Sequence, residues 1–151
     1  TLARANAGAL QLRFVEGDEL HPDANVMKMR SGRALDDADR APWLDAVAAA
    51  LRAEDQQGVI ASCSALKRRY RDQLRAAAGA IVFILPVLPR EALAKRLAAR
   101  RGHYMPPGLL DSQLADLELL GADEAGIETD GAASVESQVQ VIRSRLPGWV
   151  R

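Results

Sequence analysis

The chain has 151 residues, of which 20 are basic and 20 acidic, so its formal net charge is zero. A chain of this length fits one domain, which buries about 68–70% of its unfolded surface without disulfides or metals. A neutral chain offers no broad electrostatic surface for nucleic acid or an anionic membrane, and we expect neither as a partner. Its single cysteine cannot form an internal disulfide, which favours the reducing cytoplasm. The sequence contains no long apolar span and no charged-then-apolar leader, so it does not predict membrane insertion or secretion.

The first part of the chain predicts a helix, a strand and a short second helix. The chain opens on a helical pattern at Thr1, and an apolar run at 11–15 predicts a buried strand. Residues 16–23 form the loop after that strand. Residues 24–31 predict a helix that ends at Gly32, a good C-terminal stop.

The remaining elements alternate between helical periods and short apolar runs. They are a helix from Pro42 to about Gln57, a strand at 59–63, a helix from Ser64, a strand at 80–85 closed by Pro86, a helix from Arg90 to about Arg100, a helix carrying Leu110, Leu114 and Leu117, a strand at 126–130 and a helix capped by Ser134. Strands that alternate with helices imply βαβ units. We therefore predict an α/β fold with a three-layer, doubly wound parallel sheet.

The stretch Gly-Asp-Glu-Leu-His-Pro at 17–22 places a carboxylate and a histidine directly after the first strand. Ligands of open α/β sheets bind at the carboxyl ends of the strands, and a glycine lets the backbone approach a substrate closely. Asp18 is therefore the first candidate for chemistry. The alternative is that Asp18 caps the following turn and His21 packs on the surface.

Basic side chains gather at two helical positions. Lys67 and Arg71 are one turn apart near the end of the strand at 59–63, so both could point at one ligand above the sheet. Arg96 and Arg100 share one face of a later helix. Such pairs suit a phosphate or a carboxylate. A solvated helix face explains either pair equally well.

The loop at 102–108 holds His103 between glycines and prolines, which suggests a flap that closes on a ligand. An ordinary connection between helices is the alternative. His21 and His103 have too few companions to argue for a zinc site. Cys63 lies in an apolar strand and is interpreted as a core residue rather than a nucleophile. The chain has no Ser-His-Asp order, no paired cysteines and no Gly-x-Gly-x-x-Gly, which removes several classes of enzyme.

Several short motifs occur in one order along the chain. They are Gly-Asp-Glu-Leu-His-Pro at 17–22, Lys-Met with Ser-Gly at 28–32, Leu-Asp-Asp-Ala-Asp-Arg at 35–40, Pro-Trp-Leu at 42–44, Cys-Ser-Ala-Leu-Lys with Tyr-Arg-Asp at 63–72, Arg-Arg-Gly-His-Tyr-Met at 100–105 and Leu-Leu-Asp-Ser-Gln at 109–113. Together they resemble the thermosensitive-type bacterial gluconokinases.

This resemblance implies a P-loop kinase that moves the γ-phosphoryl of ATP to the 6-hydroxyl of D-gluconate, with Mg²⁺ as cofactor. It implies a single domain over 1–151 with a lid around 96–121, located in the cytoplasm and able to form a homodimer. Asp18 would accept or orient the proton of the attacking hydroxyl. The substrate side would contain His21, Arg40, Lys67, Arg71 and His103. The nucleotide side would contain Thr1, with Arg96 and Arg100 on the lid.

The main departure from the family is the phosphate-binding loop, because Gly-x-x-x-x-Gly-Lys-Ser/Thr is absent from these residues. In the family that loop would end at or just before Thr1, after the central strand of the sheet. Without the strand, we expect an unfilled slot between two parallel neighbours. We expect the natural protein to carry both features upstream.

Two smaller departures concern Glu16, where the family usually has aspartate, and the turn at 86–89, which lacks the usual glycine. A related kinase of shikimate-like type, or a non-catalytic module that binds sugar acids, remains an alternative.

Overall fold

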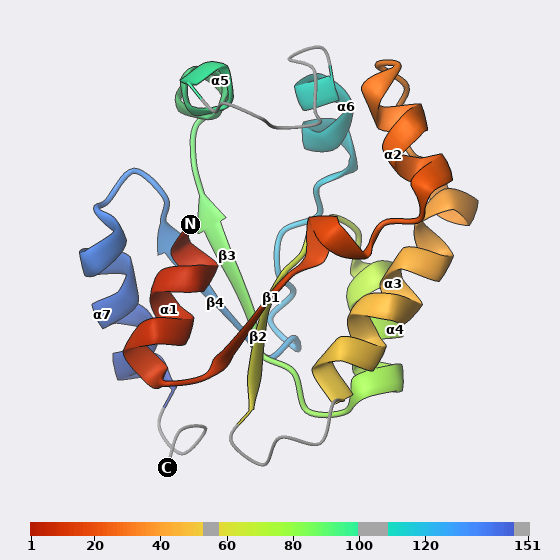
Figure 1. Cartoon of the computed structure of the whole chain (residues 1–151). Helices are drawn as coiled ribbons and strands as arrows, with labels where there is room; N and C mark the ends of the chain where they lie inside the picture. Colours follow the sequence, from red (N-terminus) through yellow and green to blue (C-terminus); the bar gives the residue numbers. More distant parts are fainter. Residues whose placement is uncertain (53–57, 100–108, 147–151) are drawn as a thin grey trace.

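The computed structural model describes residues 1–52, 58–99 and 109–146, and among these the side chains of 97–99 and 109 are not described. Parallel strands run through the middle of the molecule and helices cover them on two sides (Figure 1). The strands are β1 (Arg13–Glu16), β2 (Val59–Ser62), β3 (Phe83–Val87) and β4 (Gly126–Asp130). These layers confirm the predicted α/β class.

The helices fall into three groups. Helices α1 (Leu2–Leu10) and α7 (Val135–Arg145) lie on one side of the strands, and α3 (Asp37–Arg52) and α4 (Arg68–Ala78) lie on the other (Figure 1). Helices α2 (Asp23–Arg30), α5 (Arg90–Ala99) and α6 (Leu109–Asp116) lie beyond the carboxyl ends of the strands. A short 3-10 turn, η1 (Gly17–Leu20), follows β1.

The strands form two parallel pairs rather than one continuous sheet. Strand β1 pairs with β2 from Arg13↔Val59 to Glu16↔Ser62, and β3 pairs with β4 from Phe83↔Gly126 to Val87↔Asp130. Among the described residues no ladder of hydrogen bonds joins β2 to β3. This is the arrangement expected if a central strand is missing from between them.

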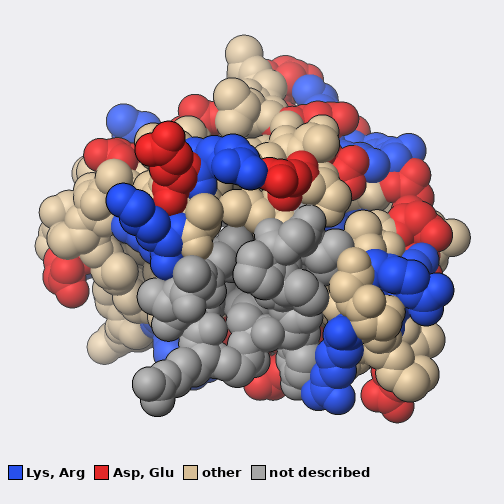
Figure 2. Space-filling model, turned by 90° about the horizontal axis from the view of Figure 1, so that it is seen from above, with Lys and Arg blue, Asp and Glu red and all other residues tan. Residues whose placement is uncertain are grey.

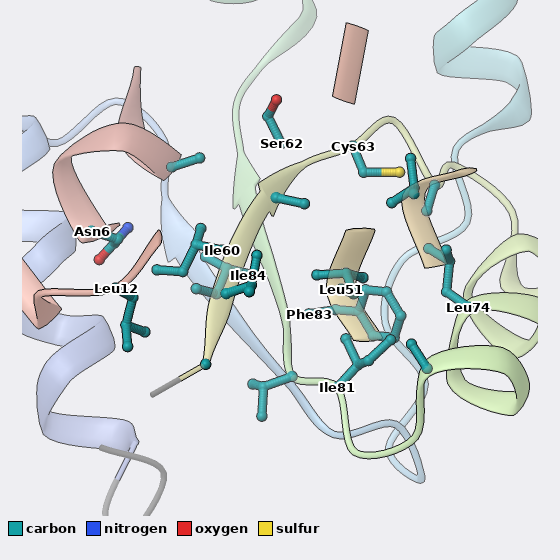
Figure 3. Close-up of a pocket in the computed structure, with 18 of the residues that line it drawn as sticks. Asn6, Leu12, Leu51, Ile60, Ser62, Cys63, Leu74, Ile81, Phe83 and Ile84 are labelled. Atoms are coloured by element: carbon teal, nitrogen blue, oxygen red, sulfur yellow. The ribbon is translucent and has the colours of Figure 1, made fainter. Parts of the chain in front are cut away.

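A cavity of about 430 Å³ lies where that strand is expected. Ile60 of β2 and Ile84 of β3 line it, together with Asn6 of α1 and Leu12 (Figure 3). The Oδ1 atom of Asn6 is buried and has no hydrogen-bond partner among the described residues. The slot is therefore mostly apolar, with one buried acceptor at its wall.

Three predicted boundaries are wrong. Helix α4 begins at Arg68 rather than near Ser64. Helix α3 begins at Asp37 rather than at Pro42, because the Asp36 carboxylate accepts from the Asp39 N–H (2.9 Å) and the Asp39 carboxylate accepts from the Asp36 N–H (2.9 Å). Strand β3 begins three residues later than predicted, ends two residues later and includes Pro86. Proline lacks a backbone N–H and removes one donor from the ladder, and Pro86 lies next to the last residue of the strand.

Other predicted elements are confirmed. Strand β4 has the predicted bounds, and Ser134 caps α7 by accepting from the Ser137 N–H at 3.1 Å. A buried hydrophobic cluster lies between α3 and α4 and is formed by Trp43, Leu44, Val47, Ala48, Tyr70 and Leu74. In the described part of the chain, no helix combines the length and apolar character needed to cross a membrane.

Candidate active site

The turn that carries Asp18 begins at a tightly held glycine. The Gly17 N–H donates to Ser62 Oγ (3.1 Å), and the Gly17 carbonyl accepts from Trp43 Nε1 (2.8 Å). A Cβ atom at Gly17 would lie 2.0 Å from the Ser62 carbonyl oxygen, so no larger residue fits. The η1 turn is thereby fixed at the carboxyl end of β1, and Asp18 is exposed on it.

His21 ends the same turn and packs against the core. Its ring stacks on Trp43, with the centroids 4.4 Å apart and an angle of 10° between the planes. Its Nδ1 lies 3.4 Å from Nδ2 of Asn25. Burial lowers the pKa of His21; the Asp18 carboxylate partly opposes this shift, and Arg40 adds to it. The imidazole is therefore neutral at pH 7.

Arg40 is the buried cation of this region. It is 5% exposed, and its Nε has no hydrogen-bond partner among the described residues. The charges of Arg40 and Asp18 both influence the pKa values of His21 and Cys63. These four side chains therefore lie near one another, at the carboxyl ends of β1 and β2. A buried donor without a partner is costly unless a ligand or water satisfies it.

Cys63 follows β2 and borders the same neighbourhood. Part of the residue reaches the surface, yet the protein around its sulfur raises the pKa of the thiol to about 12. The thiol is therefore protonated at neutral pH and is not an activated nucleophile. The expectation that Cys63 is not a nucleophile agrees with this, whereas the expectation that it is a core residue is wrong, because Cys63 is exposed just after the end of β2.

Lys67 is held by two carboxylates at the start of α4. Its Nζ lies 3.0 Å from Asp116 Oδ1, at the end of α6, and 3.6 Å from Asp37 Oδ1. The hydrogen bond that the Lys67 ammonium donates to Asp116 raises the pKa of Lys67. A substrate anion would therefore have to share or displace these carboxylates, and the substrate role of Lys67 stays a prediction.

Arg71 does not point at a shared ligand with Lys67, and that expectation from helical spacing is wrong. Its side chain is 4% exposed and pairs through Nε and Nη2 with both oxygens of Glu124, at 2.7 and 2.8 Å. The other N–H groups face backbone carbonyls, namely those of Ala65, Leu66, Glu118 and Leu119. All five donors of the guanidinium have partners in this arrangement, so Arg71 fastens residues 118–124 to the start of α4.

The nucleotide-side candidates are less completely described. Arg96 is exposed on α5, whereas Arg100 and His103 lie outside the described residues. Thr1 precedes α1 and caps it, with Oγ1 accepting from the Arg4 N–H at 3.3 Å. The lid expected around 96–121 includes residues outside the described ranges, so it stays a prediction.

Charged groups on the described surface around the carboxyl ends are mixed in sign. Figure 2 shows basic and acidic side chains interspersed on this face. On the described part of this face the basic groups form no broad patch, so local groups such as Arg40 are the candidates for recognition of an anion.

The described residues could bind Mg²⁺ only together with a nucleotide, whose phosphates would supply further ligands. Among them, no cluster of three or more His, Cys, Asp or Glu residues could hold a metal ion. Mg²⁺ commonly takes one or two protein carboxylates and completes its coordination with phosphate and water. Glu16 and Asp18, at and just after the end of β1, are carboxylates of the right kind.

Sequence reasoning missed three residues that shape the site. Ser62 and Trp43 hold Gly17, and Glu124 neutralises Arg71. Ser62 could have been found, because parallel pairing of the first two predicted strands brings their carboxyl ends together. The partners of Trp43 and Arg71 lie 26 and 53 residues away, and no local pattern reveals them.

Comparison with solved structures defines the class. The chain superimposes on an unliganded sugar kinase from Janibacter with a TM-score of 0.88 and 36% identity, covering 99% of this chain and 90% of that one. A gluconokinase from Sinorhizobium meliloti gives a TM-score of 0.83 and 40% identity, covering 93% and 79%. The fold is that of a sugar kinase.

Sequence relatives narrow the class to a family, although no family model matches the chain. The chain is 48% identical over 133 residues to a gluconokinase of Gluconobacter oxydans, covering 87% of this chain and 75% of that protein. It is 40% identical over 124 residues to the thermosensitive gluconokinase of Escherichia coli, covering 80% and 66%. The chain belongs to the gluconokinase family.

Proposed function

We propose that this protein is an ATP-dependent gluconokinase that transfers the γ-phosphoryl group to the 6-hydroxyl of D-gluconate. The observation that carries the site assignment is Arg40, a buried guanidinium with an unsatisfied Nε beside Asp18 and His21. A sugar acid has suitable partners for both charged groups. Its carboxylate and hydroxyls can accept hydrogen bonds from Arg40, while another hydroxyl faces the Asp18 carboxylate.

Each side chain has a distinct task in this proposal. Asp18 accepts or orients the proton of the attacking hydroxyl, which makes that oxygen a better nucleophile. His21 is neutral and fixed by its stacking on Trp43, so it can hydrogen-bond a sugar hydroxyl without adding charge. Arg40 binds the sugar acid, and Lys67 joins it when the substrate competes with Asp116.

The proposed nucleotide site depends on a strand that would fill the slot between β2 and β3. A strand placed there would run parallel to both neighbours and would fill the apolar cavity. The chain starts toward the carboxyl ends of the strands, and α1 runs back from there (Figure 1). A phosphate-binding loop after such a strand would lead into Thr1, where the start of α1 favours phosphate.

The cofactor and the lid complete the proposed reaction. Mg²⁺ bound with ATP would neutralise charge on the phosphates, with Glu16 and Asp18 as candidate carboxylates. Arg96 and Arg100 would stabilise the transferred group from the lid, and His103 would line the substrate side. We also propose a cytoplasmic location and a homodimer.

The test is a substitution of Arg40 in the complete natural protein. Loss of a hydrogen bond to a charged group costs about 1.5–3 kcal/mol, so Arg40→Met should raise KM for gluconate roughly ten- to a hundredfold. KM for ATP should change by less than about twofold, because Arg40 does not face the slot in this proposal. An unchanged KM for gluconate would remove Arg40 from the site.

Arg13 offers a matched control. It lies at the amino end of β1, where its Nη2 donates to the Ala50 carbonyl at 2.8 Å. Arg13→Met removes an arginine of the same size from the far end of the same strand pair. It should leave both KM values unchanged.

A further inference from the structure

The two peptide groups that precede Asp18 are each held by a side chain from another element. Ser62 of β2 accepts from the Gly17 N–H, which belongs to the peptide between Glu16 and Gly17. Trp43 of α3 donates to the Gly17 carbonyl, which belongs to the peptide between Gly17 and Asp18. Because a peptide group is planar, fixing these two planes places the N and Cα atoms of Asp18, and the bond from the His21 N–H to the Asp18 carbonyl (3.5 Å) restrains the peptide group that follows.

Each holding group is restrained by further contacts. Trp43 is fully buried, in the cluster that also contains Leu44, Val47 and Leu74. The Ser62 hydroxyl donates to the Glu16 carboxylate, so its hydrogen is committed and a lone pair is left for the Gly17 N–H. The Ser62 carbonyl closes the remaining space beside Gly17.

Trp43 also controls the other end of the turn. Its ring stacks on His21, so one indole fixes both the carbonyl that precedes Asp18 and the imidazole three residues after it. The carboxylate and the histidine are therefore placed relative to α3, the helix that also carries Arg40.

We propose that Trp43 and Ser62 are positioning residues that aim Asp18 at the substrate hydroxyl, an inference that rests on the proposed gluconokinase reaction. Neither residue touches the reacting atoms in this account. Each acts through the Gly17 backbone, and a displacement of about 1 Å in a reacting group can reduce turnover about a hundredfold.

The experiment measures kcat and both KM values for variants of the complete natural protein. Trp43→Phe keeps a ring to stack on His21 but removes the N–H, and kcat should fall at least tenfold while KM for ATP changes by less than about twofold. Ser62→Ala should lower kcat in the same way. Ser62→Thr keeps the hydroxyl and should recover most of the loss.

Thr129→Val is the matched control for loss of a buried hydrogen bond. Thr129 is 5% exposed, and its Oγ1 donates to Gln138 Oε1 at 2.9 Å, in the β4 half of the molecule. The variant should melt at a lower temperature but keep the wild-type kcat. An equal loss of kcat in Thr129→Val would show that general destabilisation, and not positioning, explains the other variants.

The wild-type assay separates the two proposals. A wild-type enzyme that does not phosphorylate gluconate would refute the proposed function. An active wild type with unchanged kcat in folded Trp43→Phe and Ser62→Ala would refute the positioning role alone.

Discussion

Replacement of Glu124 by glutamine should destabilise the protein far more than its place in an irregular segment suggests. Glu124 and Arg71 are 0% and 4% exposed at their side chains, and two hydrogen bonds of 2.7 and 2.8 Å join them. Glu124→Gln keeps the volume but leaves the guanidinium as an uncompensated buried charge. Breaking such a pair costs about 3–5 kcal/mol, a large part of the stability of one domain.

The same contact region supplies a matched control. Arg68 and Asp123 also form two hydrogen bonds, both of 2.7 Å, but their side chains are 41% and 69% exposed. Solvent screens such a pair, so Asp123→Asn should cost at most about 1 kcal/mol. Urea unfolding at pH 7 measures both losses. Equal losses for Glu124→Gln and Asp123→Asn would refute the view that burial makes the Arg71–Glu124 pair structural.

Two further predictions concern Lys67 and His21. Lys67→Ala should raise KM for gluconate about tenfold with little change in kcat, and an unchanged KM would limit Lys67 to its ion pairs with Asp116 and Asp37. Burial lowers the pKa of His21, so the unfolded chain binds more protons below its ordinary value of about 6.5. The unfolding free energy should therefore fall as the pH drops from about 7 to 5, and His21→Asn should flatten that fall. The same pH dependence in His21→Asn and wild type would contradict this assignment.

Much of the fold could be predicted because its signals are local. Strand β4 shows alternate burial along 126–130, and Ser134 is a local cap that starts α7. The start of α3 was misplaced because Pro42 is a strong local signal, whereas the reciprocal bonds of Asp36 and Asp39 depend on backbone geometry. The slot between β2 and β3 was predictable only through the family resemblance.

The site was predictable to the extent that its residues follow the strands. Asp18 and His21 lie on one turn after β1, and Arg40 joins them from α3. The prediction that Lys67 and Arg71 point at one ligand was wrong. Helical spacing shows which side chains are neighbours on a helix surface, but it does not reveal a buried partner from another segment. Glu124, 53 residues from Arg71, decides where that guanidinium points.

A coupled assay for ADP release from the complete natural protein tests the central claim most directly. Gluconate, shikimate and nucleoside monophosphates are offered in turn with ATP and Mg²⁺, and Asp18→Asn serves as the catalytic control because it removes proton acceptance with little change in volume. Of the acceptors offered, only gluconate should be phosphorylated. Asp18→Asn should lose most of its kcat but still bind ATP. Turnover with shikimate but not gluconate, or gluconate binding without ATP binding, would contradict the central claim.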